Sequence, residues 1–457
     1  MVQPDLMAGV TERLREFVAP FVRSLFQGKQ RVRATNFIGG LLSDVERKNA
    51  ESIAYRYDEE RKDMQYFLGE SEWDHRPLLV ELATQVGRDL GRADGVIVFD
   101  PSGFAKKGTE SVGVQRQWCG RLGKVDNCQV GIFLGYVSEV EHALVNERLF
   151  LPADWARDQA RREKCHVPDD VCFATRHRLC LDMLDEVGEL LPHGWIAGDD
   201  EMGRSTAFRR ELRERRERNL LAVPSNTLIR DLDVIPADDP WRSPVGKDKF
   251  QRVEKWRAAL DEAAWQRIDV RDGEKGPLIV DLVSWRVQAK TSGGRVGPEE
   301  LLVVIRSRET GSDWKHDYYL SNASAETAPA ELARVAKAEH RIEDCFQRAK
   351  SDAGLAHYEV RGWGGWHHHM ALSMVAAWFL NVETRRGEKK DGRPDAFAGP
   401  LLDRSRTSCR ARVRSTGPRR QRLHATTRTK SDGSLLPLQT SEPLMPSSFR
   451  TQTFLEQ

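Results

Sequence analysis

The sequence lacks the features that would place the protein in a membrane or outside the cell. No apolar run is long enough to span a bilayer, which takes about 20 predominantly apolar residues. The N-terminus has no basic segment followed by an apolar one, as a secretory signal would. The seven cysteines form no C-x-x-C pair, so a zinc ribbon is not expected. We therefore expect a reduced, cytoplasmic protein.

The chain also has little net charge. Its 457 residues carry a formal charge of +2 and are 39% hydrophobic and 31% charged, which suits a globular protein of two or three domains. Residues 393–457 hold 12 Lys/Arg against 5 Asp/Glu, which leaves −5 for residues 1–392. A nucleic-acid site in the main body must then be a local basic patch. Ser, Thr, Arg and Pro dominate residues 393–457, where we expect a disordered basic tail.

Helical spacing of apolar residues characterises the first ninety positions. Four segments indicate helices: residues 10–26, 37–42, 53–67 and 73–90. We expect residues 1–90 to form a helical domain, which is either a packing appendage or a DNA-end-binding domain. In the second case the phosphate contacts would be Lys29, Arg31 and Arg33.

A short strand is indicated just after this helical region. Residues 96–99 are β-branched or aromatic, and they end on Asp100 and the turn formers Pro101, Ser102 and Gly103. A rigid strand that delivers a carboxylate to a turn is a common way to fix a catalytic or metal-binding acid. The alternative is that Asp100 only caps the turn.

Basic side chains follow Asp100 in the next two dozen residues. Lys106 and Lys107 lead into a glycine-rich loop that contains Trp118. The loop also holds three basic residues, Arg116, Arg121 and Lys124. Cations interleaved with an aromatic ring suit a track along a nucleic-acid backbone. The alternative is an ordinary solvated loop.

The elements after this loop alternate in an informative order. We expect strands at residues 127–136, 143–151, 194–200 and 219–224, with helices at residues 176–190 and from residue 205. Three antiparallel strands followed by helix, strand, helix and strand is the order of ribonuclease-H-like folds. In such a sheet the first and fourth strands are neighbours, which would bring Asp100 next to Asp199. Two carboxylates this close repel each other unless a divalent cation lies between them.

A third acid lies on a helix that we expect at residues 336–353. Its apolar stripe consists of Ile342, Cys345, Phe346 and Ala349. Glu343 and Lys350 are seven residues apart and fall on one line beside this stripe. Glu343 can therefore reach a site under the packed helix, and Lys350 can meet a phosphate there. The alternative is a surface pair on an amphipathic helix.

With these acids placed, the sequence resembles the DDE transposases of bacterial insertion sequences, in the insertion-sequence 701 group related to group 4. The resemblance is long and in order, so it is more specific than any one acidic residue. Its stretches cover most of residues 50–385: AYRYDEERKDMQYFLGESEWDHRPLL, VIVFDPSGFAKKGTESVGVQRQWCGRLGKVDNCQVG, WIAGDDEMGRSTAFRREL with LLAVPSNT, and AEHRIEDCFQRAKSDAGLAHYEVRGWGGWHHHMALSM.

The resemblance implies a role for each acid. Asp100 and Asp199 match the two catalytic aspartates, with Asp200 as the adjacent alternative. Glu343 matches the catalytic glutamate, and Lys350 matches the lysine that follows it after six residues.

The chain departs from the family pattern at two positions ahead of the glutamate. The pattern has a Tyr and an Arg where this chain has Ala336 and Glu339. The phosphate contact of that Arg then needs a substitute. Lys337 and Arg341 are the nearest cations, although neither is in register.

The expected chemistry is metal-dependent cleavage and joining of DNA strands. Asp100, Asp199 and Glu343 would hold two Mg²⁺ ions, with Mn²⁺ as a substitute. The expected DNA-binding residues are Lys106, Lys107, Arg116, Arg121, Lys124 and Lys350. The expected partners are terminal inverted repeats and target DNA, with a homodimer on the DNA, no membrane, and a nucleoid-associated location. Two alternatives stay open: a catalytically impaired end-binding protein, and a general ribonuclease-H-like nuclease.

The expected fold is α/β. A ribonuclease-H-like core with a mixed five-stranded sheet would comprise residues 91–228 and 331–392, and a β-rich insertion would comprise residues 229–330. Within the insertion, the β-rich runs are residues 265–270, 277–288, 301–307 and 317–320.

Three consecutive histidines, His367, His368 and His369, suggest a metal site. Adjacent helical residues point in different directions, so the three cannot all bind one ion. We expect them to pack or to face DNA.

Overall fold

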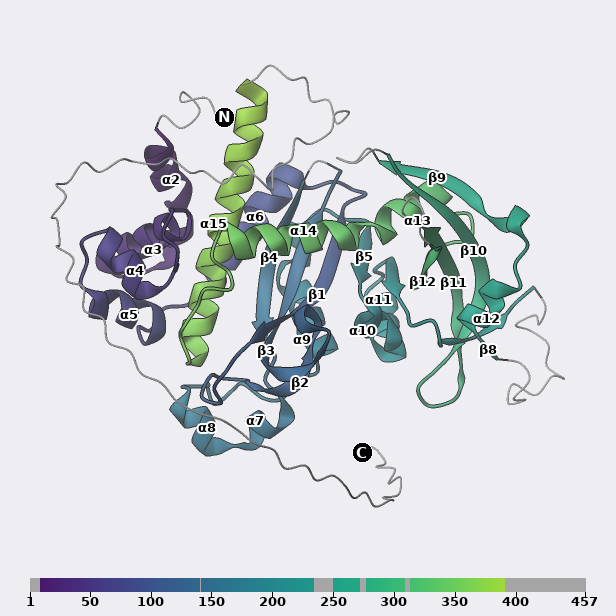
Figure 1. Cartoon of the computed structure of the whole chain (residues 1–457), viewed down its shortest axis with the longest axis horizontal. Helices are drawn as coiled ribbons and strands as arrows, with labels where there is room; N and C mark the ends of the chain where they lie inside the picture. The colour runs from purple at the N-terminus through teal and green to yellow at the C-terminus, as the bar shows by residue number, and fades with distance from the viewer. Residues whose placement is uncertain (1–8, 140, 234–249, 272–276, 309–312, 391–457) are drawn as a thin grey trace, which may run out of the picture. The chain divides into compact units, whose positions relative to one another are not determined.

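A computed structural model describes residues 9–139, 141–233, 250–271, 277–308 and 313–390 (Figure 1). The chain divides into two units, Met1–Arg410 and Ala411–Gln457, and every described residue belongs to the first. The basic tail expected at residues 393–457 lies outside the described residues. No helix in the described ranges has the length and apolar character needed to cross a membrane.

Within the described ranges, twelve strands form one mixed sheet, in the order β2-β3-β1-β5-β6-β12-β11-β10-β7-β8, with β4 paired to β3 and β9 paired to β10. The strands are β1 (Val96–Ala105), β2 (Gln115–Cys119), β3 (Lys124–Val137), β4 (His142–Leu149), β5 (Trp195–Gly198), β6 (Asn219–Ala222), β7 (Leu228–Asp231), β8 (Gln251–Arg252), β9 (Gln266–Arg271), β10 (Leu278–Lys290), β11 (Val296–Ser307) and β12 (Lys315–Ser321).

The first part of the sheet has the strand arrangement expected from the sequence. β1 pairs with β3 and β3 with β4, both antiparallel, whereas β5 runs parallel to β1 and β6 parallel to β5. The expectation that the first strand neighbours the strand ending near Asp199 is confirmed by this pairing. Val96 through Phe99 are fully buried because β1 lies between two other strands and is covered by helices.

Two expectations in this part were wrong. We expected the strand to end on Asp100 at a turn formed by Pro101, Ser102 and Gly103, but β1 continues through Ala105 because these residues stay paired with β3. Residues 115–119 form strand β2 and the 3-10 turn η2 (Gly120–Leu122), where we expected a loop. The strand forms because alternate side chains, Gln117 and Cys119, are buried while Arg116 and Trp118 face outward. Gly123, with φ +61°, supplies the left-handed turn into β3.

The second part of the sheet contains the β-rich runs expected between residues 265 and 320, which fall on β9 to β12. We expected a five-stranded core sheet with a separate insertion, but β12 pairs with β6 and makes the sheet continuous. A buried ion pair reinforces this junction: Arg209 of α11 contacts Glu300 of β11 at 2.8 Å. α11 spans Thr206–Glu214.

The N-terminal region is helical, as expected, but three bounds differ. The first helix is shorter, the helix expected at residues 37–42 begins at Gly28, and residues 53–67 are divided between two helices. Pro20 follows the end of α2 and cannot donate a backbone hydrogen bond, so residues 10–26 do not form one helix. Two of the basic residues proposed there have partners: Arg33 pairs with Asp63, and Arg31 donates to the carbonyl of Leu25.

The helical elements of this region are α2 (Val10–Val18), η1 (Phe21–Ser24), α3 (Gly28–Leu41), α4 (Ala50–Arg56), α5 (Arg61–Gly69) and α6 (Arg76–Leu90).

The remaining helices lie between and after the strands along the chain. They are α7 (Ala153–Arg157), α8 (Gln159–Lys164), α9 (Arg176–Val187), η3 (Gly188–Leu190), α10 (Asp200–Arg204), α12 (Val253–Ala258), η5 (Glu262–Ala264), α13 (Pro329–Ala336), α14 (Ala338–Ser351) and α15 (Trp363–Lys390).

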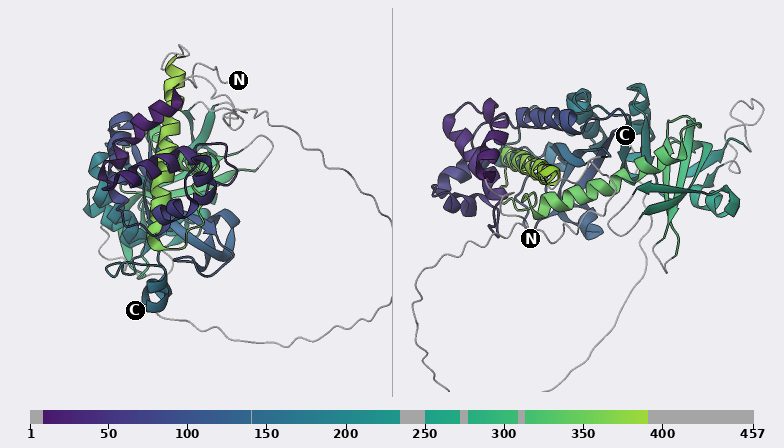
Figure 2. Two further views of the ribbon diagram at one scale, coloured as in Figure 1. Left: turned by 90° about the vertical axis from the view of Figure 1, so that its left-hand side faces the viewer. Right: turned by 90° about the horizontal axis from the view of Figure 1, so that it is seen from above.

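Two of these helices position the candidate site. α14 runs across β4, β3, β1 and β5, as Figure 1 shows. It approaches closely because Gly135 of β3 has no side chain: a Cβ there would lie 2.4 Å from Ile342 of α14. α15 packs against β4 and also against α3, α5 and α6 (Figure 2), so it ties the N-terminal helices to the sheet.

Candidate active site

Asp100 and Asp199 lie next to each other where the parallel pairing of β1 and β5 ends. Phe99 of β1 is the partner of Gly198 of β5, and each aspartate is the next residue. Asp100 is also the cross-strand partner of Phe133 in β3, and the ring of Phe133 packs 5.0 Å from that of Phe346 in α14. Since cross-strand partners share a face, Asp100 points to the face that α14 covers.

Asp199 is also the N-cap residue of α10. Its Oδ1 accepts a hydrogen bond of 3.1 Å from the backbone N–H of Met202. The neighbouring Asp200 is exposed and pairs with Arg204 at 2.9 Å. Of the two acids that the sequence left open, Asp199 is therefore the one beside Asp100.

The electrostatics of these two acids reflect their crowding. Burial raises the pKa of Asp100 well above its usual range, and the nearby carboxylates of Asp199, Glu339 and Glu343 raise it further, against the opposing effect of Lys350. Burial also raises the pKa of Asp199 to about 6, although the hydrogen bond from the Met202 N–H opposes this. Several acids thus share one region and resist being charged together.

Helix α14 brings two glutamates to this region. Glu343 is 65% exposed and lies 3.6 Å from His340, and the hydrogen bond to His340 lowers the pKa of Glu343. Glu339, one turn earlier, is half-buried, and burial followed by the charges of Asp199 and Glu343 raises its pKa to about 7. The charges of these acids interact. The more buried of the two glutamates is Glu339, which the resemblance marks only as a departure from the family pattern.

Glu339 could have been suspected from the sequence. It lies four residues before Glu343, and residues at this spacing share one face of a helix. The resemblance hides this signal, because the family pattern has an Arg at the position of Glu339.

Lys350 lies beside Asp100. Its Nζ donates a hydrogen bond of 2.9 Å to the Oγ of Ser102, which is two residues beyond Asp100 on the same face of β1. The ammonium also lies 5.0 Å from the centre of the Phe346 ring. Burial lowers the pKa of Lys350, and the charge of Asp100 opposes this.

The two substitutes considered for the missing Arg are both engaged elsewhere. Lys337 is buried and pairs with Asp317 at 3.1 Å. Arg341 donates to the backbone carbonyls of Ser138 and Glu139, at 2.9 and 3.2 Å. Neither side chain is placed to contact a phosphate beside Asp100.

The other basic candidates differ in exposure. Lys106 lies 3.6 Å above the ring of Tyr358, and burial lowers its pKa to about 8. Lys107 is exposed. The three remaining candidates are exposed and belong to the β2–β3 hairpin: Arg116, Arg121 and Lys124.

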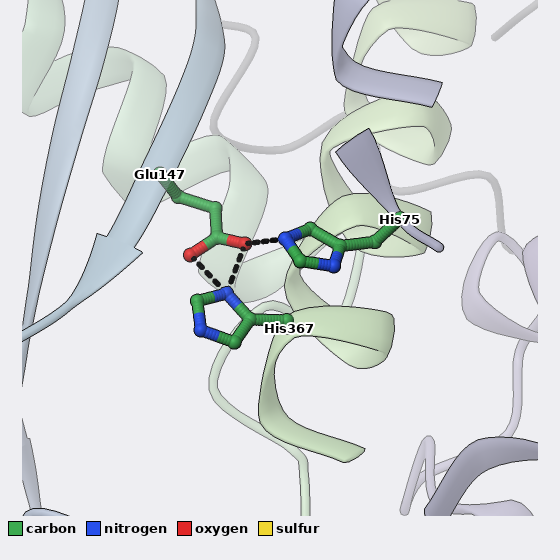
Figure 3. Close-up of side chains that lie close together, drawn as sticks. All are labelled: His75, Glu147 and His367. Atoms are coloured by element: carbon green, nitrogen blue, oxygen red, sulfur yellow. Dashed lines mark hydrogen bonds and ion pairs between the residues drawn. The ribbon is translucent and has the colours of Figure 1, made fainter. Parts of the chain in front are cut away.

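A different group has the donor types of a metal site. In the described ranges, the one set of three His, Cys, Asp or Glu with ligand atoms within 4.8 Å of one another is His75, Glu147 and His367 (Figure 3). The Nδ1 of His367 lies 2.8 Å from Oε1 of the fully buried Glu147, and the Nε2 of His75 lies 3.8 Å from the same oxygen. The catalytic candidates are therefore spaced more widely than this trio.

The ring geometry of this trio suits hydrogen bonding better than metal binding. The rings of His75 and His367 are stacked, with centres 4.5 Å apart and planes 18° from parallel. The lone pairs lie in the ring planes, so stacked rings do not direct them to one ion. Glu147 thus joins α6 to α15 through its carboxylate.

The three consecutive histidines turn to three different partners, as expected for a helix. His367 contacts Glu147, whereas His368 lies 2.9 Å from the carbonyl of Leu68 and His369 lies 3.0 Å from the carbonyl of Gly354. All three are buried, so they pack between α15 and its neighbours and do not face DNA.

The chain belongs to the DDE superfamily endonucleases, whose family model matches residues 20–277. It is also similar to the "Probable transposase for insertion sequence element IS701" of Microchaete diplosiphon, with 33% identity over 147 residues. That stretch is 30% of this chain and 37% of the relative, so the similarity spans little more than a third of the relative's length. The family match includes Asp100 and Asp199 and ends before α14.

Proposed function

We propose that the protein is a DDE-type transposase, which binds the ends of an insertion sequence and cleaves and joins DNA strands there. The family membership supports the endonuclease part, and the similarity to a transposase supports the biological role. The observation that carries the proposal is geometric: Asp100 and Asp199 follow paired residues of β1 and β5, and α14 packs over Asp100 with Lys350 bonded to Ser102. The raised pKa values of Asp100 and Glu339 support it, since the nearby acids contribute to both. The strand order β4-β3-β1-β5-β6 supports a ribonuclease-H-like core.

The residues at this site fit a divalent cation. No hydrogen-bond donor among the described residues contacts the carboxylate of Asp100, although this acid is half-buried among other acids. Oxygen ligands and surplus negative charge are what Mg²⁺ or Mn²⁺ requires. We assign the ligands as Asp100, Asp199 and Glu343, with Glu339 as an additional acid in reach of Asp199. When bound, two such ions would stabilise the charges on the attacking and leaving oxygens of a phosphodiester.

The remaining side chains would position the DNA. Lys350 is held by Ser102 beside Asp100, so its ammonium is available to a phosphate near the acids. Arg116, Arg121, Lys124 and Lys107 would contact the backbone outside the acids, because all are exposed. Lys106 is more restricted, since it is held over Tyr358.

The test uses the purified protein, Mg²⁺ and a labelled duplex carrying the DNA that flanks the gene. Wild-type protein should nick the duplex at the end of the inverted repeat, and Asp100→Ala should bind the duplex without nicking it. Binding without nicking by the wild type would instead identify an end-binding protein. Equal nicking of a scrambled duplex would indicate a general nuclease and refute the transposase assignment.

A further inference from the structure

The β2–β3 hairpin presents an unusual apolar surface to solvent. Trp118 of β2 and Val125 of β3 are cross-strand partners, and they are 55% and 52% exposed. Leu122, in the turn η2 between them, is 41% exposed. Single exposed apolar residues are ordinary, but three on one hairpin, including a Trp, form a patch that marks a contact surface.

This outward face is held rigidly by the inward one. Gln117 is buried, donates to the carbonyl of Cys128 at 2.9 Å, and accepts a hydrogen bond of 3.2 Å from Arg176. Arg176 is in turn paired with Glu201 at 2.7 Å. Because alternate strand residues face opposite sides, fixing Gln117 fixes the outward direction of Trp118. The backbone that carries the indole is therefore held in place before a partner binds, which lowers the entropic cost of binding.

Cations surround the patch. Arg116 precedes Trp118 by two residues and shares its face, and Arg121 and Lys124 flank the turn. Within the described part of the chain, Arg116 and Arg121 make no ion pair or side-chain hydrogen bond, whereas Lys124 pairs with Asp126 at 3.0 Å. Two exposed guanidinium groups that form no salt bridge among the described residues, beside an exposed indole, are complementary to a polyanion that carries aromatic rings.

The hairpin also lies beside the candidate active site. Arg121 is near enough to Lys350 to contribute to lowering its pKa, and Lys350 contacts Ser102 next to the acids. The hairpin also packs closely on β1 at Cys119 and Gly103. A Cβ at Gly103 would lie only 2.8 Å from the Sγ of Cys119. A nucleic-acid strand at Asp100 would thus pass the hairpin.

We propose that Trp118 is a stacking platform for an unpaired base of the DNA strand held at the acids, with Val125 and Leu122 as its apolar border and Arg116 and Arg121 on the flanking phosphates. The inference rests on the proposed function, since it takes the strand near Asp100 as its ligand. Stacking on an indole tolerates any base, so this contact adds affinity for unpaired nucleotides without reading their sequence.

The test is binding of fluorescein-labelled oligothymidine to the full-length protein, followed by anisotropy in EDTA so that no cleavage occurs. Trp118→Ala should weaken binding roughly 5- to 150-fold, the range for loss of one stacked base, with an unchanged salt dependence. Trp118→Phe should restore most of the affinity. Arg116→Ala and Arg121→Ala should each reduce the salt slope by about 1. Tyr66→Ala, which removes an exposed aromatic from α5, is the matched control and should bind as the wild type does.

Two outcomes would overturn the inference. One is wild-type affinity of Trp118→Ala for oligothymidine. The other is a Trp118→Ala variant that changes the molar mass in solution and leaves DNA affinity intact, which would mean that the patch contacts a second copy of the chain. Because binding is measured without divalent ions, a wild-type protein that never nicks DNA would refute the proposed function while leaving this inference standing.

Discussion

Asp100 and Asp199 are brought together by backbone pairing, because the residues before them, Phe99 and Gly198, are partners in parallel strands. Their crowding has a measurable consequence for stability. Asp100→Asn removes a half-buried acid whose pKa is raised by burial and by its acidic neighbours, so we expect the thermal midpoint without divalent ions to rise by about 2–4 °C. The same variant should lose Mg²⁺-dependent nicking. The matched control is Asp200→Asn, at the exposed neighbour, which should change neither property. A lower midpoint for Asp100→Asn would contradict the crowding.

The two glutamates of α14 can be separated by mutation. Glu343→Gln should lose nicking at any Mg²⁺ concentration, because we assign this residue as a metal ligand. Glu339→Gln should keep the reaction but raise the Mg²⁺ concentration for half-maximal nicking by about 10- to 100-fold. This is the effect expected for an acid that influences the metal ligands without binding the metal itself. A titration of nicking rate against Mg²⁺ measures both. If Glu339→Gln abolishes nicking and Glu343→Gln does not, their roles are reversed.

Lys106 gives a prediction about pH. Its pKa in the folded protein is lowered to about 8 from its ordinary value of 10.5, chiefly by burial. The unfolded chain therefore binds this proton more tightly, and this group makes the free energy of unfolding rise as pH increases from 8 to 10.5. Lys106→Met should be stabilised relative to the wild type at pH 7, with a difference that shrinks toward pH 10. Urea denaturation at both pH values measures it, and Lys107→Met, at an exposed lysine, should show no such trend. A constant difference would mean that the pKa of Lys106 is ordinary.

The carboxylate of Glu147 is expected to stabilise the junction of α6, β4 and α15. Glu147→Ala leaves the buried Nδ1 of His367 without its partner, which should lower the free energy of unfolding by about 1–3 kcal/mol. The exposed Glu139 provides the control, since Glu139→Ala should cost less than about 0.5 kcal/mol. Equal stability of both variants would show that the buried contact contributes nothing.

Chelation tests whether the same trio binds a metal. Because the rings of His75 and His367 are stacked, we expect no bound metal there, and EDTA should leave the thermal midpoint of freshly purified protein unchanged. Metal analysis of the Asp100→Ala variant should find no stoichiometric zinc. The trio would instead be a metal site if the thermal midpoint of the wild type fell with EDTA and recovered with Zn²⁺, and that of His75→Ala did not.

The local pattern of the chain was enough to locate most elements near the site. Short apolar runs predict the two strands before Asp100 and Asp199, and an apolar stripe with helical spacing predicts α14. The order of these elements along the chain then limited the sheet to an arrangement in which β1 and β5 are neighbours, as the pairing confirms.

Other features depended on contacts between distant segments. The β2 strand was missed because its Gly-rich surroundings favour a loop, and only pairing with β3 and burial of Gln117 make it a strand. The continuity of the sheet from β6 to β12 joins residues about a hundred positions apart, which no local period encodes.

The sequence by itself therefore determined which residue types lie at the ends of which elements, because side-chain periodicity and turn chemistry are local properties. Tertiary structure alone decided which of those side chains became buried together. It placed Glu339 among the acids, occupied Lys337 and Arg341 with other partners, and left Trp118 exposed on a hairpin with two exposed arginines. The reason is physical: burial and electrostatic coupling depend on distances between residues, and those distances exist only after the chain has folded.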